Sequence, residues 1–158
     1  MEEALDKNIA LLKTSKRSDK VENSAAVVIE VNTGAVLAMD SRPDDKITQQ
    51  NRVIQGRYIP GSIFKPITAI AALETGNVTP TEKIHNPGRY WKAPYIKSTA
   101  PIGYYNLYSA MGKSDNVYFQ EIGRRTGIDA IGYYGAEFGL DTPTGIDLAY
   151  ENRGERVS

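Results

Sequence analysis

The sequence contains no cysteine and a single histidine, His85. Without cysteine the chain can form neither a disulfide framework nor a thiolate metal site, and one histidine cannot build a multi-histidine metal centre. We therefore expect neither a metal nor a cofactor, and we expect His85 to be a surface residue. Because exported and cytosolic proteins both tolerate this composition, the lack of cysteine leaves the compartment open.

The chain also lacks net charge and long apolar runs. Nineteen basic residues balance nineteen acidic ones, and no segment collects enough Lys or Arg to neutralise a run of phosphates, so we expect no nucleic-acid partner. The longest apolar stretch, residues 67–73, is far shorter than the roughly 20 residues of a membrane-spanning helix. The first residues have neither a basic nor an apolar leader, so we expect any targeting signal or anchor to lie outside this sequence.

What remains is the composition of a soluble globular domain, with 41% hydrophobic and 24% charged residues in 158 positions. Two apolar runs, 25–31 and 35–39, flank an Asn-Thr-Gly turn and predict a β-hairpin, and their near-continuous apolarity predicts a sheet covered on both faces. The helical spacing of apolar residues predicts helices over 2–12, 62–75, 107–112, 117–126 and 129–138. The polar or irregular stretches 13–23, 41–55, 78–105 and 141–158 are expected to be loops.

Ser62 and Lys65 stand at the start of the apolar helix predicted over 62–75. At a spacing of three residues their side chains share a helix face. Desolvation and the positive end of the helix dipole both disfavour an ammonium group there, so a neutral Lys65 amine becomes accessible and can take the proton of Ser62. The N-H groups of the same first turn can stabilise an oxyanion. The alternative is that Ser62 only caps the helix and Lys65 extends to the surface.

A second polar triplet, Ser114-Asp115-Asn116, follows Ser62 by 52 residues in a tight connection between two predicted helices. By itself this triplet could simply supply an N-cap for the helix that begins at Val117, a role that Ser or Asn would fill. Ser-x-x-Lys together with Ser-x-Asn is, however, two thirds of a known acyl-transfer signature, whose third part is Lys-Thr-Gly. The pairing therefore favours a serine nucleophile over two unrelated caps.

Four segments resemble the transpeptidase domain of penicillin-binding proteins. Residues 58–66 (Tyr-Ile-Pro-Gly-Ser-Ile-Phe-Lys-Pro) are similar to the nucleophile segment of the high-molecular-weight members, and residues 106–110 and 114–119 are similar to their second motif. Residues 138–148 resemble a segment that follows it. The class B, elongation-type branch is the nearest match, and the resemblance extends from about residue 24 to residue 148.

The resemblance implies an acyl-transfer cycle on peptidoglycan. Ser62 would attack a D-alanyl-D-alanine stem peptide, expel D-alanine and pass the acyl group to an amine of a neighbouring strand, while β-lactam antibiotics would acylate the same serine. Lys65 would be the general base, Ser114 would relay a proton towards the leaving group, and Asn116 would orient Lys65 and the substrate. A serine β-lactamase or D,D-carboxypeptidase, or a β-lactam-sensing module without turnover, remains an alternative.

The resemblance also implies a fold and a location. We expect an α/β three-layer architecture in which helices cover a mainly antiparallel sheet, with a leading helix and loop over 1–23 and the hairpin and nucleophile-bearing helices over 24–158. The full-length protein would work at the extracytoplasmic face of a bacterial cell membrane. Since neither Lys-Thr-Gly nor Lys-Ser-Gly occurs here, we expect the third motif on another segment or chain, and the isolated chain to be poorly active.

The aromatic residues of the 78–105 stretch allow two interpretations. Trp91 and the tyrosines of this region could line a peptide groove, or they could pack a long loop against its domain. The tyrosines in question are Tyr90, Tyr95, Tyr104 and Tyr105. The adjacent Arg124 and Arg125 lie at a predicted helix C-terminus, where the helix dipole favours them without any ligand.

Overall fold

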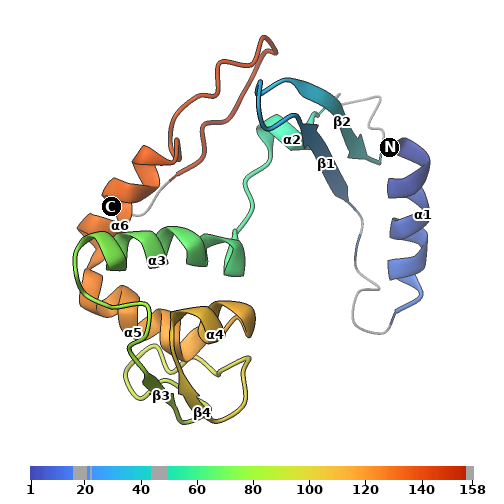
Figure 1. The fold of residues 1–158 in the computed structure, drawn as a ribbon. Coiled ribbons are helices and arrows are strands. Elements are labelled where there is room, and N and C mark those ends of the chain that lie inside the picture. The colour runs from blue at the N-terminus through green and yellow to red at the C-terminus, as the bar shows by residue number, and fades with distance from the viewer. Residues whose placement is uncertain (16–20, 22, 44–49, 156–158) are drawn as a thin grey trace. The chain divides into compact units, whose positions relative to one another are not determined.

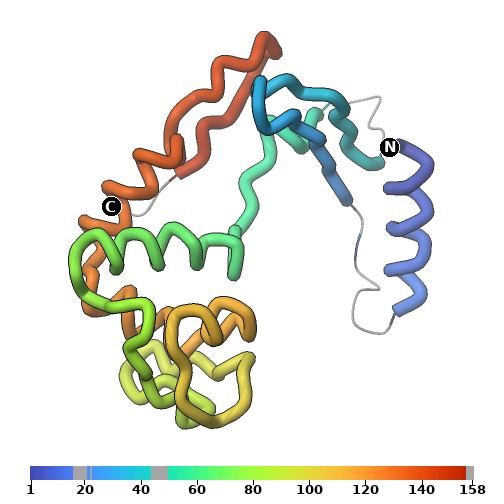
Figure 2. Tube along the Cα trace, in the orientation of Figure 1, coloured from blue at the N-terminus to red at the C-terminus, as the bar shows by residue number. Residues whose placement is uncertain are grey.

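A computed structural model describes residues 1–15, 21, 23–43 and 50–155 of the 158-residue chain (Figures 1 and 2). The chain forms two compact units. One consists of Met1–Tyr58 together with Gly145–Asn152, and the other consists of Ile59–Thr144 together with the described residues that follow Asn152. The predicted loops over 13–23 and 41–55 lie partly outside the described residues. Within the described ranges, no helix combines the length and apolarity needed to cross a membrane.

The first unit contains the predicted hairpin. Strands β1 (Ser24–Ile29) and β2 (Val36–Arg42) pair antiparallel, from Ser24 opposite Arg42 to Ile29 opposite Val36. The turn between them closes where the Gly34 N-H donates to the Glu30 carbonyl at 2.8 Å. Gly34 has φ +74°, a left-handed conformation that glycine adopts without strain, so the predicted turn is confirmed.

The two faces of this hairpin are less covered than the sequence predicts. Val27 and Val28, which point to opposite faces of β1, are 41% and 45% exposed, and Ile29 is 52% exposed. The apolar run predicts burial on both faces, but within the described residues of this chain neither face of β1 is fully covered. The prediction of complete cover is therefore wrong for this chain taken by itself.

Helix α1 (Glu2–Lys13) corresponds to the predicted leading helix and packs against the hairpin. Arg42, at the end of β2, is only 8% exposed and is surrounded by acidic groups. Its guanidinium lies 2.7 Å from Glu2 and 3.3 Å from Asp6, both on α1, and 3.6 Å from Asp40. This ion-pair cluster attaches the leading helix to the hairpin.

A short helix, α2 (Arg52–Gln55), occupies the end of the stretch that was predicted to be a loop. Asn51 caps it, since the Asn51 side chain accepts a hydrogen bond from the Val53 N-H at 3.1 Å. The helix packs against both strands of the hairpin. One helical turn is too short to show a hydrophobic period, which is why the sequence pattern did not predict it.

The second unit is mainly helical. Helix α3 (Lys65–Glu74) contacts both α5 (Asn116–Thr126) and α6 (Ile128–Glu137), and α4 (Leu107–Gly112) contacts α5 (Figure 1). The fully buried side chains at the centre of the core cluster include Ala72 of α3, Ala110 of α4, and Tyr118 and Ile122 of α5. The elements of this unit are η1 (Gly61–Phe64), α3 (Lys65–Glu74), β3 (Ile84–Asn86), β4 (Gly103–Tyr105), α4 (Leu107–Gly112), α5 (Asn116–Thr126) and α6 (Ile128–Glu137). The helices predicted over 107–112, 117–126 and 129–138 are thus confirmed to within one residue.

The helix predicted over 62–75 has a different beginning and ends one residue earlier, at Glu74. Residues Gly61–Phe64 form a 3₁₀ turn, η1, and the α-helix α3 starts only at Lys65. Pro66 explains the difference, because proline has no N-H with which to bond the Ser62 carbonyl four residues earlier, and its ring would clash with that carbonyl. The Lys65 N-H bonds the Ser62 carbonyl instead, as a 3₁₀ turn requires.

The stretch predicted to be an irregular loop, residues 78–105, contains a small sheet. Strands β3 and β4 pair antiparallel, with Ile84 opposite Tyr105 and Asn86 opposite Gly103. His85 is exposed, as predicted, but it lies in strand β3 and not in a loop. The centroid of its ring lies 4.8 Å from that of Tyr104. Three-residue strands are too short for their alternation to be detected in the sequence.

A buried carboxylate, Glu121 of α5, accepts hydrogen bonds from three side chains. Glu121 is 5% exposed and accepts hydrogen bonds from Tyr90 Oη at 2.7 Å, from Arg125 Nε at 2.7 Å and from Arg124 at 3.0 Å. Arg125 also contacts Glu82 at 2.6 Å. Burial by itself would raise the pKa of Glu121, but the hydrogen bonds from Arg124, Tyr90 and Arg125 lower it to about 2.

This pKa predicts an acid-sensitive contribution to stability. Because the folded-state pKa of Glu121 lies near 2 and its ordinary value is 4.5, the contribution is complete above pH 4.5 and is lost as the pH falls towards 2. Its size is on the order of 3 kcal/mol. The free energy of unfolding, measured by urea denaturation at pH 7 and pH 3, should therefore decrease more in the parent chain than in Glu121→Gln.

The matched control is Glu137→Gln, which changes an exposed carboxylate on α6. This variant should unfold with the parental free energy and the parental pH dependence to within about 0.5 kcal/mol. If Glu121→Gln and Glu137→Gln behave alike at both pH values, the Glu121 network does not stabilise the fold.

Candidate active site

The turn from η1 into α3 places Ser62 and Lys65 on one face. In a 3₁₀ turn, side chains three residues apart eclipse one another, so the two groups stand directly in line. Ser62 is exposed, whereas Lys65 is only 9% exposed and begins an apolar helix. The nucleophile candidate is therefore accessible, and the amine beside it is largely removed from water.

Ser114 and Asn116 come from the tight turn between α4 and α5. Ser114 has φ +53°, an uncommon conformation for a residue with a side chain. Hydrogen bonds hold it there: the Ser114 N-H donates to Met111 O at 3.0 Å, the Asp115 N-H donates to Ala110 O at 2.9 Å, and the Thr99 hydroxyl donates to the Ser114 carbonyl. This strained turn brings the Ser114 hydroxyl towards α3.

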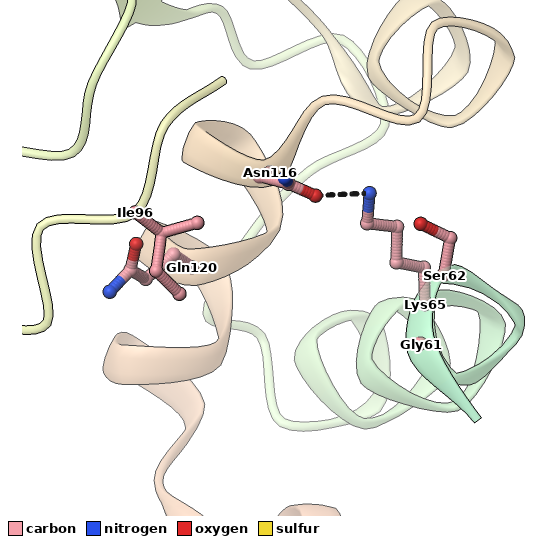
Figure 3. Close-up of a pocket in the computed structure, with 6 residues that line it drawn as sticks. All are labelled: Gly61, Ser62, Lys65, Ile96, Asn116 and Gln120. Carbon is pink, nitrogen blue, oxygen red and sulfur yellow. Dashed lines mark hydrogen bonds between the residues drawn. The ribbon is translucent and has the colours of Figure 1, made fainter. Parts of the chain in front are cut away.

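Hydrogen bonds connect the four predicted site residues. Lys65 Nζ donates to Ser114 Oγ at 2.9 Å, to the Ser114 carbonyl at 2.6 Å and to Asn116 Oδ1 at 2.9 Å. Ser114 Oγ lies 2.9 Å from Ser62 Oγ. Lys65 thus contacts Ser62 through the Ser114 hydroxyl, and Figure 3 shows Nζ directed at Asn116 with Ser62 beside it.

Opposing effects act on the Lys65 amine. Burial lowers the pKa of Lys65 below its ordinary value of 10.5, while the negative charge of Asp115 partly offsets this by raising it. The aromatic ring of Phe119 lies 5.5 Å from Nζ. The net result is an amine that loses its proton more readily than a lysine in water does.

Asp115 is a site residue whose position the sequence did not predict. It is completely buried and it, not Ser or Asn, is the N-cap of α5, because its Oδ1 accepts from the Val117 N-H at 2.9 Å. The same oxygen accepts from Asn86 Nδ2 at 3.0 Å and from Ser98 Oγ at 2.9 Å. The preference of Asp for N-caps was a signal available in the sequence, but the two distant donors were not.

An open pocket of roughly 480 Å³ lies in front of these groups. Gly61, Ser62, Lys65 and Asn116 line one part of it, and Ile96 and Gln120 complete the lining (Figure 3). The volume falls within the range of about 300–1,000 Å³ that small-molecule sites occupy. Among the described residues, no group of His, Cys, Asp and Glu side chains is arranged to hold a metal ion.

The family model for the penicillin-binding protein transpeptidase domain matches residues 24–157 of the chain. The chain belongs to this family. The peptidoglycan D,D-transpeptidase MrdA of Escherichia coli K12 is 30% identical over 83% of this chain and 25% of its own length, and MrdA of Acinetobacter baumannii is 32% identical over 82% and 23%. The chain therefore spans about a quarter of the length of these curated relatives.

The crystal structure of Pseudomonas aeruginosa PBP2 in complex with WCK 5153 has the same fold. It superposes with a TM-score of 0.77 at 30% identity, over 88% of this chain and 38% of that one. The predicted class of fold, helices with a mainly antiparallel sheet as part of a penicillin-binding transpeptidase domain, is thereby confirmed. The predicted class B branch is confirmed as well, since the relatives include MrdA and FtsI.

The aromatic residues of the 78–105 stretch differ in their burial. Tyr90 is buried and donates its hydroxyl to Glu121, which fits the packing interpretation. Trp91, Tyr95 and Tyr104 are 47%, 62% and 70% exposed, and none of them lines the pocket described above. The pocket contact from this stretch is Ile96, which the sequence did not single out.

The hydrogen bonds of the buried Asn86 lead to a prediction about the free energy of unfolding. Asn86 is 1% exposed, and besides contacting Asp115 it donates to Ser98 Oγ at 2.6 Å and accepts from the Gly88 N-H at 2.7 Å. In Asn86→Ala the buried carboxylate loses a donor, so the free energy of unfolding should fall by about 3 kcal/mol. Urea denaturation monitored by tryptophan fluorescence measures this change.

Asn77→Ala is the matched control, because the Asn77 side chain makes an exposed hydrogen bond to Thr75. It should change the free energy of unfolding by no more than about 0.5 kcal/mol. A loss in Asn86→Ala as small as that in the control would show that the network around Asp115 contributes little to stability.

Proposed function

We propose that this chain carries the nucleophile of a peptidoglycan D,D-transpeptidase, in which Ser62 forms an acyl-enzyme with D-alanyl-D-alanine stem peptides. The observation that carries the proposal is the continuous set of hydrogen bonds from Ser62 Oγ through Ser114 Oγ to Lys65 Nζ. The name of the MrdA relatives supports the same reaction.

The protonation state of Lys65 sets the direction of the hydrogen bonds. An ammonium group has only donors, so it donates to Ser114, and Ser114 then donates to Ser62. A neutral amine has a lone pair and can accept, so the hydroxyls turn around: Ser62 donates to Ser114, and Ser114 donates to Lys65. Only the second arrangement removes the proton from Ser62, and the lowered pKa of Lys65 makes it accessible.

Acylation then proceeds by proton transfer and addition. As Ser62 Oγ bonds to the penultimate carbonyl carbon of the stem peptide, its proton passes through Ser114 to Lys65. The carbonyl oxygen becomes an oxyanion, for which the N-H groups at the start of the η1–α3 segment are the donors on this chain. Asn116 keeps Nζ oriented through its Oδ1, 2.9 Å away.

The tetrahedral intermediate collapses when the C–N bond to the terminal D-alanine breaks. The departing amine takes a proton from Lys65 through Ser114, which leaves an ester on Ser62 and a neutral Lys65. An amine of a neighbouring stem peptide attacks this ester, gives its proton to the same relay and restores the Ser62 hydroxyl. A β-lactam follows the first half of this path, since its ring amide takes the place of the peptide bond.

The third motif of the signature would be supplied by the remainder of the transpeptidase domain, on another segment or chain. Neither Lys-Thr-Gly nor Lys-Ser-Gly occurs in this sequence, and the chain spans only about a quarter of the curated relatives' length. We place the complete enzyme at the extracytoplasmic face of a bacterial cell membrane, where its peptidoglycan substrate is found. The 24–158 segment is the part of the domain that would hold the nucleophile.

Ser62→Ala should abolish covalent labelling by a fluorescent penicillin in the full-length protein, because Ser62 Oγ is the exposed hydroxyl that Ser114 connects to Lys65. Labelling is measured on gels and located by mass spectrometry of tryptic peptides. Ser109→Ala, which alters a serine at the start of α4, is the matched control and should label like the parent. Persistent labelling of folded Ser62→Ala would move the nucleophile to another residue.

The acylation rate should rise with pH as Lys65 loses its proton, and Asp115→Asn should shift that rise to lower pH. Removing the Asp115 charge leaves burial unopposed and lowers the pKa of Lys65 further. Asparagine can still cap α5, so the turn is preserved. The measurement is the second-order rate constant for penicillin acylation of the full-length protein between pH 5 and pH 10.

Lys65→Arg serves as the reference for this profile, because a guanidinium is protonated throughout that range. Its acylation rate should be lower by about 10²- to 10⁴-fold, the usual contribution of a general base. A profile that stays in place in Asp115→Asn, or an arginine variant as fast as the parent, would show that Lys65 is not the base.

A further inference from the structure

Three residues of the 78–105 stretch are hydrogen-bonded to the Ser114-Asp115-Asn116 triplet. Residues 97, 98 and 99 bond residues 116, 115 and 114, so the two segments match residue for residue in opposite order. The pairs are the Lys97 carbonyl with Asn116 Nδ2 at 3.1 Å, Ser98 Oγ with Asp115 Oδ1 at 2.9 Å, and Thr99 Oγ1 with the Ser114 carbonyl. Each member of the triplet is therefore fixed by one member of this segment.

The Ser114 carbonyl accepts hydrogen bonds from two different segments. Lys65 Nζ donates to it at 2.6 Å, and the Thr99 hydroxyl donates to it as well. A carbonyl oxygen has two lone pairs, so both are occupied. Of the three hydrogen bonds that Nζ donates, this one is the shortest, since the other two measure 2.9 Å. The carbonyl is thus a principal acceptor of the Lys65 amine.

The neighbours of Thr99 hold its hydroxyl in place. Ser98 Oγ accepts from Asn86 Nδ2 at 2.6 Å and from the Ala100 N-H at 2.9 Å, and Ala100 is only 8% exposed. Threonine is β-branched, so its side chain has few rotamers to choose from. Thr99 itself is exposed and is not among the residues that line the pocket. Its hydroxyl therefore reaches the site through Ser114, from a fixed position.

The second donor on this carbonyl affects the proton on Lys65. A hydrogen bond from an ammonium group is charge-assisted and stronger than one from a neutral amine, so a strong acceptor beside Nζ keeps the proton there. The Thr99 hydroxyl competes for the electron density of the same oxygen and weakens this preference. Thr99 therefore favours the neutral amine, whereas the charge of Asp115 favours the ammonium group.

The charged groups near the Lys65 amine come from three segments. Asp115, at the start of α5, raises the pKa of Lys65, while burial lowers it. Lys97, beside α5, and Lys113, in the α4–α5 turn, are both exposed, so water and salt screen their charges. The other group that α5 presents is the uncharged ring of Phe119. A substitution that alters hydrogen bonds alone leaves all of these charges as they are.

We infer that Thr99 is a positioning residue for acylation: its hydroxyl fills the second lone pair of the Ser114 carbonyl, so that this carbonyl orients the Lys65 amine without holding the proton on it. The inference rests on the proposed role of Lys65 as the base for Ser62. Loss of the Thr99 hydroxyl would leave the ammonium group with a stronger acceptor. Since only the neutral amine can take the proton of Ser62, acylation would then require a higher pH.

The test is the pH dependence of acylation in Thr99→Val, which replaces the hydroxyl by a methyl group of similar size. The second-order rate constant for benzylpenicillin is measured on the full-length protein between pH 5 and pH 10. The midpoint of its rise should move up by about half a pH unit, a fraction of the strength of one neutral hydrogen bond. Below the midpoint the rate should fall by about threefold, while the plateau at high pH stays parental.

Two further variants identify the group responsible. Thr99→Ser keeps the hydroxyl and should keep the parental midpoint. Thr81→Val is the matched control, since Thr81 is an exposed threonine of the same stretch, and it should leave the whole profile unchanged. The midpoint does not depend on the fraction of active protein, so it can be compared between variants that fold to different extents.

A midpoint that stays or falls in Thr99→Val, or that rises equally in Thr99→Ser, would overturn the role of Thr99. A rate lowered at every pH around the parental midpoint would overturn it too, because that is the result of a purely structural contact. A parent protein that benzylpenicillin does not acylate, or whose rate does not rise with pH, would instead overturn the proposed function of Ser62 and Lys65, and this inference with it.

Discussion

The rest of the second unit depends on the burial of one amine, that of Lys65, at the first turn of an apolar helix. An amine removed from water needs acceptors, and α3 offers none in that direction. The acceptors are instead the Ser114 hydroxyl and carbonyl and the Asn116 amide, 2.6 to 2.9 Å away. The α4–α5 turn must therefore stay in contact with α3, so the position of the Lys65 amine depends on the stability of that turn.

Hydrogen bonds to Asp115 and the apolar core both support the α4–α5 turn. The buried Asp115 caps α5 and collects donors from Asn86 and Ser98, so the β3 region is attached to the same carboxylate that influences Lys65. The buried side chains of α3, α4 and α5 pack beneath it and leave little room for the helices to shift. The acceptors of the Lys65 amine are thus supported by buried groups behind the turn.

The polar network at the other end of α5 has a related consequence. Glu121 accepts a hydrogen bond from the Tyr90 hydroxyl. The Tyr90 backbone N-H in turn donates to the Ile96 carbonyl. The pocket wall is therefore connected to the core on one side by Tyr90 and on the other by the amides of Asn116 and Gln120. One helix, α5, thus contacts both Lys65, through Asn116 Oδ1, and the segment that carries Ile96.

The sequence by itself was sufficient for the local features. The hairpin around Gly34, the helices of the second unit and the pairing of Ser62 with Lys65 follow from turn preference, hydrophobic period and a three-residue spacing, all of which are properties of short segments. Its motifs also predicted the penicillin-binding family, which the match over residues 24–157 confirms. The roles of the site residues stay predictions.

Only the tertiary structure decided which groups meet across long stretches of chain. The route from Lys65 to Ser62 through Ser114, and the position of Ile96 between the carbonyls bonded by α5, depend on contacts between residues 19 to 52 positions apart. No local pattern encodes such contacts, because each arises when separate helices pack on a common core. The same reason applies to Asp115: its sequence neighbours show a helix cap, whereas its burial among Asn86 and Ser98 exists only in the folded chain.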